Sequence, residues 1–122
     1  MLTLPPTVRI FLAPGVTDMR KSFDGLAGAA RQILRLDPLS GHVFLFSNRR
    51  RTMVKLLLWD GSGFWVFAKR LERGTFAWPA PEAGRDHVEL RNEDLALLIG
   101  GLDPARTRRR RWYERRPRGI AS

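Results

Sequence analysis

Three clusters of basic side chains contain the residues of this sequence that are best suited to binding a phosphate-bearing ligand. The first cluster is Arg20 with Lys21, the second is Arg49, Arg50 and Arg51, and the third is Lys69, Arg70 and Arg73. Of the 22 basic residues, 19 are arginine, whose planar guanidinium group can pair with two phosphate oxygens at once. We predict that these eight side chains form one phosphate-contacting surface on the folded protein.

Each cluster also has a simpler interpretation. Arg20 can pair with Asp18 and only stabilise the start of a helix, and residues 49–51 can be solvated side chains of a connecting loop. A GC-rich genome would also favour arginine over lysine. Codon usage does not explain the net charge of +10, because exchanging lysine for arginine leaves the charge unchanged. The charge therefore indicates a polyanionic partner, and nucleic acid is the commonest one in the cytoplasm.

Most of the excess charge lies at the end of the chain. Residues 105–122 hold eight arginines and one acidic residue, a net charge of +7, whereas residues 1–104 have a net charge of +3. The densest run is Arg108, Arg109, Arg110 and Arg111, followed by Trp112 and Tyr113. Because like charges repel, we predict a disordered tail that adds nonspecific affinity for phosphates and stacks its rings on exposed bases. A purely solubilising tail is the alternative.

The sequence offers little support for catalysis. It contains no cysteine, which excludes disulfides, thiolate metal sites and cysteine nucleophiles. His42 and His87 stand alone, the acidic residues are scattered, and no glycine-rich phosphate loop follows a strand. We therefore expect no cofactor, no metal and no enzyme activity. A metal-dependent nuclease that uses carboxylates from separate elements is the remaining catalytic alternative.

Length and hydropathy limit the class of protein. A chain of 122 residues with 43% hydrophobic residues predicts one compact domain, residues 1–104, followed by the tail, residues 105–122. The longest apolar runs have five residues, at 64–68 and 95–99, and a membrane-spanning helix needs about 20. The first residues do not resemble a secretion signal. We expect a cytoplasmic, nucleoid-associated protein with no membrane contact.

A first strand and a long helix are predicted to position the first cluster. Residues 8–13 have the composition of a strand that ends at Pro14 and Gly15. A helix follows, with Thr17, Asp18 or Ser22 as its N-cap, and it ends before Asp37-Pro38. Its apolar face is predicted to contain Phe23, Leu26, Ala27, Ala30, Ile33 and Leu34.

Three strands are predicted to position the other two clusters. They span residues 43–47, 52–59 and 64–70, and the turn at residues 60–63 pairs Trp59 with Phe64. This hairpin places the second and third clusters at the same end. A short strand at 88–90 and a short helix at 93–99 follow, the helix capped by Asn92 and by Gly100-Gly101. The predicted class is α+β, with an antiparallel sheet of four or five strands in the order β-α-β-β-β-(β)-α.

Aromatic side chains on the hairpin allow two interpretations. Core packing explains Trp59, Phe64, Trp65 and Phe67 better than an RNA-recognition motif, because the predicted order has no helix between the third and fourth strands. One face of the hairpin is expected to pack on the long helix, and the other face requires a cover or a ligand.

Several ordered motifs resemble the accessory protein called TnpB of sixty-six-type bacterial insertion sequences. Residues 17–21 are TDMRK and are followed by FDGL at 23–26, and residues 44–51 are FLFSNRRR. Residues 55–64 are KLLLWDGSGF, residues 69–76 are KRLERGTF, and LIGGLD lies at 98–103. The resemblance runs from Val8 to Asp103 and leaves the arginine-rich tail outside.

The resemblance implies a role in transposition beside a separately encoded transposase that carries out strand transfer, and it carries over no catalytic residues. Together with the charge, it predicts a non-catalytic DNA-binding accessory factor. One alternative is a module that docks on the transposase through an uncovered hydrophobic sheet face. A third possibility is an RNA-binding protein or a nuclease, and the oligomeric state is left open.

Overall fold

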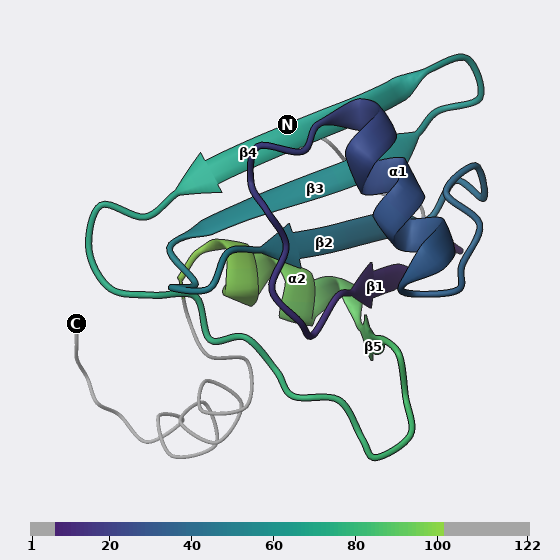
Figure 1. Ribbon diagram of the computed structural model, residues 1–122. Helices are drawn as coiled ribbons and strands as arrows, with labels where there is room; N and C mark the ends of the chain where they lie inside the picture. The colour runs from purple at the N-terminus through teal and green to yellow at the C-terminus, as the bar shows by residue number, and fades with distance from the viewer. Residues whose placement is uncertain (1–6, 102–122) are drawn as a thin grey trace.

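The computed structural model describes residues 7–101, which form one α+β unit (Figure 1). The order of elements is the predicted one, with five strands and two helices. The strands lie in a single sheet in the order β4-β3-β2-β1-β5. The proposed tail, including Arg108, Arg109, Arg110 and Arg111, lies outside the described residues.

The sheet is mixed, whereas the sequence analysis predicted it to be antiparallel. Strand β1 (Ile10–Leu12) pairs in parallel with β2 (Val43–Ser47), and the other three pairings are antiparallel. Strand β5 (Val88–Leu90) pairs with the free side of β1. The parallel pair arises because a helix connects β1 to β2, so the chain returns to its starting end before β2 begins. The first strand is also shorter than the predicted 8–13.

The hairpin was predicted correctly. Strand β3 (Met53–Trp59) pairs with β4 (Phe64–Arg70), and Trp59 lies opposite Phe64. In the connecting turn the Asp60 carboxylate accepts hydrogen bonds from the backbone N–H groups of Ser62 and Gly63 at 2.8 and 3.0 Å. The turn residues thereby set the register of both strands.

Helix α1 (Phe23–Gln32) covers one face of the sheet but ends earlier than predicted. Its N-cap is Ser22, whose side chain makes no capping hydrogen bond. After Gln32 the backbone turns back, with Arg35 at a left-handed φ of 60° and the N–H of Leu36 bonded to the carbonyl of Ala30. Phe23 and Ile33, expected on the buried face, are 48% and 61% exposed.

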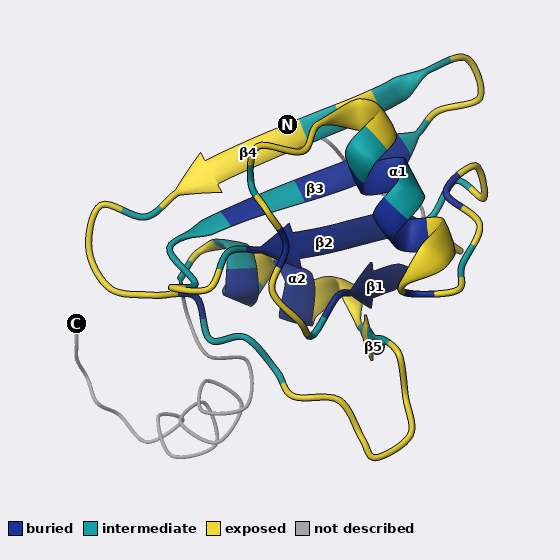
Figure 2. Ribbon diagram, in the orientation of Figure 1, coloured by how far each residue is buried: buried dark blue, intermediate teal, exposed yellow. Residues whose placement is uncertain are grey.

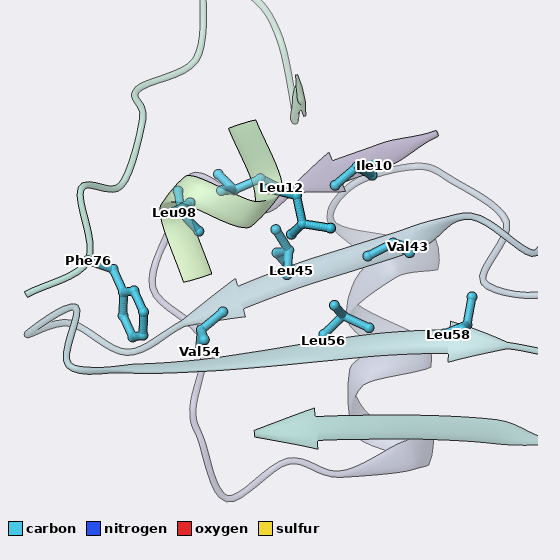
Figure 3. Packing of buried hydrophobic residues seen from close by; sticks show 10 residues of the cluster. Ile10, Leu12, Val43, Leu45, Val54, Leu56, Leu58, Phe76 and Leu98 are labelled. Atoms are coloured by element: carbon cyan, nitrogen blue, oxygen red, sulfur yellow. The ribbon is translucent and has the colours of Figure 1, made fainter. Parts of the chain in front are cut away.

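The two faces of the sheet carry separate hydrophobic clusters, because side chains alternate along each strand. Under α1 the cluster includes Phe11, Phe44, Phe46 and Leu57 with helix residues such as Leu26. On the opposite face, helix α2 (Asn92–Ile99) and the segment after β4 cover β1 and β2 (Figure 3). That cluster contains Ile10, Leu12, Val43, Leu45, Val54, Leu56, Leu58, Phe76, Leu95 and Leu98.

Helix α2 begins one residue before the predicted start, with Arg91 rather than Asn92 at the N-cap. Its C-terminal cap agrees with the prediction, since Gly101 has a φ of +85° and its N–H bonds to the carbonyl of Leu98. The helix does not extend over β4, whose second half is exposed (Figure 2). The sheet face that required a cover is therefore covered over β1, β2 and β3 and open at β4.

Candidate nucleic-acid interface

Three loops meet at one end of the sheet, the end where β2 and β4 finish and β3 begins (Figure 1). The N–H of Thr17, in the loop before α1, bonds to the carbonyl of Ser47 at 2.9 Å. The N–H of Leu71 bonds to the carbonyl of Thr52 at 2.8 Å. Met53 also pairs with Arg70, so the second and third basic clusters lie at the same end, as predicted.

Asn48 builds the turn between β2 and β3. Its side-chain carbonyl accepts hydrogen bonds from the N–H groups of Thr52 and Met53 at 2.9 and 3.1 Å. Its side-chain amide donates to the Thr52 hydroxyl at 3.0 Å. This bonding closes a tight turn with Arg49 and Arg50 at its exposed tip.

Arg51 faces into the protein. Its backbone has a left-handed φ of 57°, and its guanidinium group donates to the carbonyls of Pro14 and Gly15 at 2.8 and 3.0 Å. The same group lies 5.2 Å from the centre of the Trp78 ring, and partial burial lowers the pKa of Arg51. We call Arg51, Pro14, Gly15 and Trp78 the Arg51 junction. It joins three loops that are far apart in the sequence.

Arg49 and Arg50 remain available to a ligand. Both residues are exposed, and in the described part of the chain neither forms an ion pair. Arg73, in the loop after β4, is likewise exposed without a carboxylate partner among residues 7–101. These three guanidinium groups are the open cations of this end of the sheet.

The first cluster is partly neutralised. The Arg20 guanidinium forms a two-point ion pair with Asp18, with a shortest distance of 2.7 Å. This pairing and the Arg20 backbone N–H lower the pKa of Asp18 to about 2. Arg20 therefore pairs with Asp18 near the start of α1, as in the simpler interpretation of this cluster. Lys21, the next residue, is exposed.

The third cluster is divided between the two faces of the sheet. By strand alternation Lys69 and Arg70 point to opposite sides of β4. The Lys69 ammonium donates to the carbonyl of Ile99 at 2.8 Å, at the C-terminus of α2. Arg70 lies 3.6 Å from the carboxylate of Glu72, with both groups exposed. The eight cations thus do not share one face, and the open ones gather at the loops.

Two residues that shape this end of the sheet, Lys55 and Trp78, were not predicted from the sequence to do so. Lys55, in the middle of β3, donates to the carbonyl of Lys21 at 2.8 Å and fixes the start of α1. Trp78 donates its indole N–H to the carbonyl of Ala13 at 2.7 Å. A tryptophan in a loop rich in proline and alanine was a signal for packing that loop onto the core.

The hairpin aromatics divide into two pairs. Trp59 and Phe64 pack edge to face with ring centres 5.0 Å apart and are partly buried, in agreement with the expected core role. Trp65 and Phe67 are 52% and 41% exposed, so core packing is wrong for them. The reason is that α2 stops short of β4.

The histidines lie together around one ring. His42 and His87 contact the Phe11 ring at centre distances of 5.8 and 5.2 Å. The Nδ1 atom of His42 accepts the backbone N–H of Arg9 at 2.9 Å. Within residues 7–101, no three His, Asp or Glu side chains are placed to share a metal ion. Neither helix in that range has the length and apolar composition needed to cross a bilayer.

We predict that acid weakens the hairpin turn. Hydrogen bonds from the Ser62 and Gly63 backbone and from the Trp65 indole lower the pKa of Asp60 to about 2. A lowered folded-state pKa contributes stability above about pH 4, and this contribution is lost as the pH falls toward 2. The melting temperature of Asp60→Asn should therefore fall less than that of the wild type between pH 5 and pH 2.5. Asp24→Asn, which removes an exposed carboxylate from the first turn of α1, is the control, and equal pH dependence in both variants would contradict the prediction.

The sequence of the chain is similar to a known protein family and to two bacterial proteins. Residues 8–109 match the family model described as IS66 Orf2 like protein. The chain is 39% identical over 103 residues to Uncharacterized protein y4hO of Sinorhizobium fredii (strain NBRC 101917 / NGR234), covering 84% of this chain and 88% of that one. It is 34% identical to Uncharacterized protein y4jC of the same strain, covering 84% and 86%. No solved structure matches the chain.

The family match extends further than the sequence motifs suggested. It ends at residue 109 and so includes Arg108 and Arg109, which were expected to lie outside the shared region. The first part of the arginine-rich segment therefore belongs to the matched region.

Proposed function

Because the chain belongs to the family of IS66 Orf2-like proteins, accessory proteins of bacterial insertion sequences, we propose that it binds the DNA of its element. In this proposal the protein is not catalytic and acts with the separately encoded transposase, in the cytoplasm at the nucleoid. Arg49, Arg50 and Arg73 contact phosphates from the folded domain. Arg70, at the same end of the sheet, and the exposed Lys21 contribute further positive charge, and residues 108–111 add nonspecific affinity.

The observation that supports this proposal most strongly is the open state of the cations at one end of the sheet. Several other arginines of the described chain are paired: Arg9 forms a two-point pair with Glu89, and Arg91 lies 3.3 Å from Glu93. At the β2–β3 turn, Arg49 and Arg50 have no such partner among residues 7–101. Exposed cations without carboxylates nearby are what a phosphate backbone requires.

The Arg51 junction supports the proposal by fixing the turn that carries these cations. Two hydrogen bonds and a ring contact hold Arg51 against loops from two other parts of the chain. The neighbouring Arg49 and Arg50 are therefore held on a rigid support, which lowers the entropy lost on binding. Contacts of this kind position a protein on DNA and carry little sequence information.

Titration of full-length protein with duplex DNA at several salt concentrations tests the proposal. We expect log affinity to fall with log salt with a slope of about −3 or steeper, since each neutralised phosphate contributes roughly −0.9. A parallel titration with duplex RNA separates the two polymers. A flat salt dependence, or tighter binding to RNA, would overturn the proposal.

A second candidate is docking on the transposase without DNA contact. The exposed rings Trp65 and Phe67 favour it, because a large apolar patch on a sheet edge often marks an interface. Retention of the purified transposase by this protein after nuclease treatment would support this candidate. Loss of retention on nuclease treatment would favour DNA binding instead.

A further inference from the structure

Two exposed aromatic rings lie side by side on the outermost strand of the sheet. Trp65 and Phe67 are two residues apart on β4, so they share the face that α2 leaves uncovered. Their ring centres are 5.9 Å apart, and their planes differ by only 9°. This is the largest pair of exposed rings among the described residues.

The pair is held in place although it is exposed. The Trp65 indole N–H donates to the Asp60 carboxylate at 2.8 Å, and Asp60 is itself fixed by the turn it closes. Phe67 then stacks on an indole whose orientation is set by that hydrogen bond. Rings ordered before binding lose little entropy when a flat ligand stacks on them.

The chemistry next to the rings favours a nucleic-acid strand. On the same face of β4, two residues beyond Phe67, lies Lys69, and Arg73 follows in the adjoining loop. Trp65, Phe67 and Lys69 are thus spaced about 6.6 Å apart along the strand, so two aromatic rings are followed by one cation. Proteins that bind single strands combine stacked aromatic rings for the bases with cations for the backbone.

We propose that Trp65 and Phe67 form a stacking platform for unpaired nucleobases, so that the protein binds single-stranded DNA along β4. The inference rests on the proposed DNA-binding function and adds the substrate class, a strand whose bases are not paired. Association of two copies through β4 is disfavoured, because each chain carries a net charge of +10. A polyanionic strand meets no such repulsion.

A comparison of two strands of equal charge tests the platform. Full-length protein is titrated at one salt concentration with an oligothymidylate of about twelve nucleotides and with an abasic strand that has the same phosphates. We expect about thirtyfold tighter binding to the strand with bases. Each of two stacked bases should contribute about fivefold, which is the lower end of the range for stacking of a base on an aromatic side chain. Because Trp112 and Tyr113 are also predicted to stack on bases, the test is made in full-length protein that carries Trp112→Ala/Tyr113→Ala. In that protein, Trp65→Ala/Phe67→Ala should abolish this ratio and leave duplex affinity unchanged.

Two further variants test whether the loss of the ratio is caused by unfolding or by the removal of any exposed ring. Trp65→Phe/Phe67→Trp keeps two rings and should restore the ratio, and Phe23→Ala removes an exposed ring on the opposite face and should not change it. Equal affinity for both strands, with salt-dependent binding retained, would overturn the platform and leave the proposed function intact. The platform would also be overturned if the wild type were a dimer and Trp65→Ala/Phe67→Ala a monomer. The same holds if the protein bound the transposase in the absence of DNA and this binding required the two rings. Absence of all DNA binding would instead refute the proposed function.

Discussion

Replacement of Arg49 and Arg50 together by alanine is expected to weaken duplex DNA binding by the full-length protein about a hundredfold at 0.1 M salt. Each lost phosphate contact removes roughly 0.9 from the slope of log affinity against log salt, which corresponds to about tenfold at this concentration. The slope itself should become shallower by about 2. Both side chains are exposed and without ion pairs in residues 7–101, so the free energy of unfolding should change by less than about 0.5 kcal/mol.

A matched variant makes this result specific to the loop end of the sheet. Arg31→Ala/Arg85→Ala also removes two exposed guanidinium groups that form no ion pair within residues 7–101, one on α1 and one in the loop before β5. These residues lie away from the β2–β3 turn, so this variant should bind DNA within about threefold of the wild type. If both double variants lost the same affinity, binding would reflect net charge alone and the proposed surface would be wrong.

Replacement of Arg51 by alanine is expected to lower the free energy of unfolding by about 3.5–4 kcal/mol. The variant loses two hydrogen bonds from a charged donor to the carbonyls of Pro14 and Gly15, each contributing about 1.5 kcal/mol at the lower end of the usual range. It also loses the guanidinium over the Trp78 ring, a contact of roughly 0.5–1 kcal/mol. Urea unfolding monitored by circular dichroism measures the difference.

Two neighbouring variants identify the source of that loss. Arg50→Ala removes the same charge one residue earlier and should leave the unfolding midpoint near that of the wild type. Arg51→Gly loses the same contacts, yet glycine adopts the left-handed φ of 57° more readily, so it should be more stable than Arg51→Ala by about 1 kcal/mol. Equal midpoints for Arg50→Ala and Arg51→Ala would show that the Arg51 junction does not stabilise the fold.

The sequence determines the hairpin well because its signals are local. The Asp60 turn fixes where β3 and β4 meet, and alternation then follows along both strands. The end of α1 was harder to predict, since its apolar spacing continues to Leu34 although the helix stops at Gln32. Leu34 is buried by a turn after the helix rather than by a further helical turn. The pattern of apolar residues records burial and does not distinguish these two backbones.

The candidate site was predictable in its location but not in its details. Counting charges finds all three basic clusters, and hairpin pairing brings two of them together. The partners of Arg51 and Lys69 are backbone carbonyls of distant residues, at Pro14 and at Ile99. Every residue has such a carbonyl, so composition gives no sign of which ones will accept a guanidinium or an ammonium. The opposite orientation of Lys69 and Arg70, in contrast, follows from strand alternation alone.

The position of β1 inside the sheet has a consequence for how this protein is made. One neighbour of β1, strand β2, follows after α1, but the other, strand β5, begins only at Val88. A ribosome synthesises the chain from its N-terminus, so β1 is exposed first and acquires its second neighbour last. A nascent chain that ends before Val88 keeps an unpaired β1 edge that can join another strand, whereas the finished chain closes that edge itself.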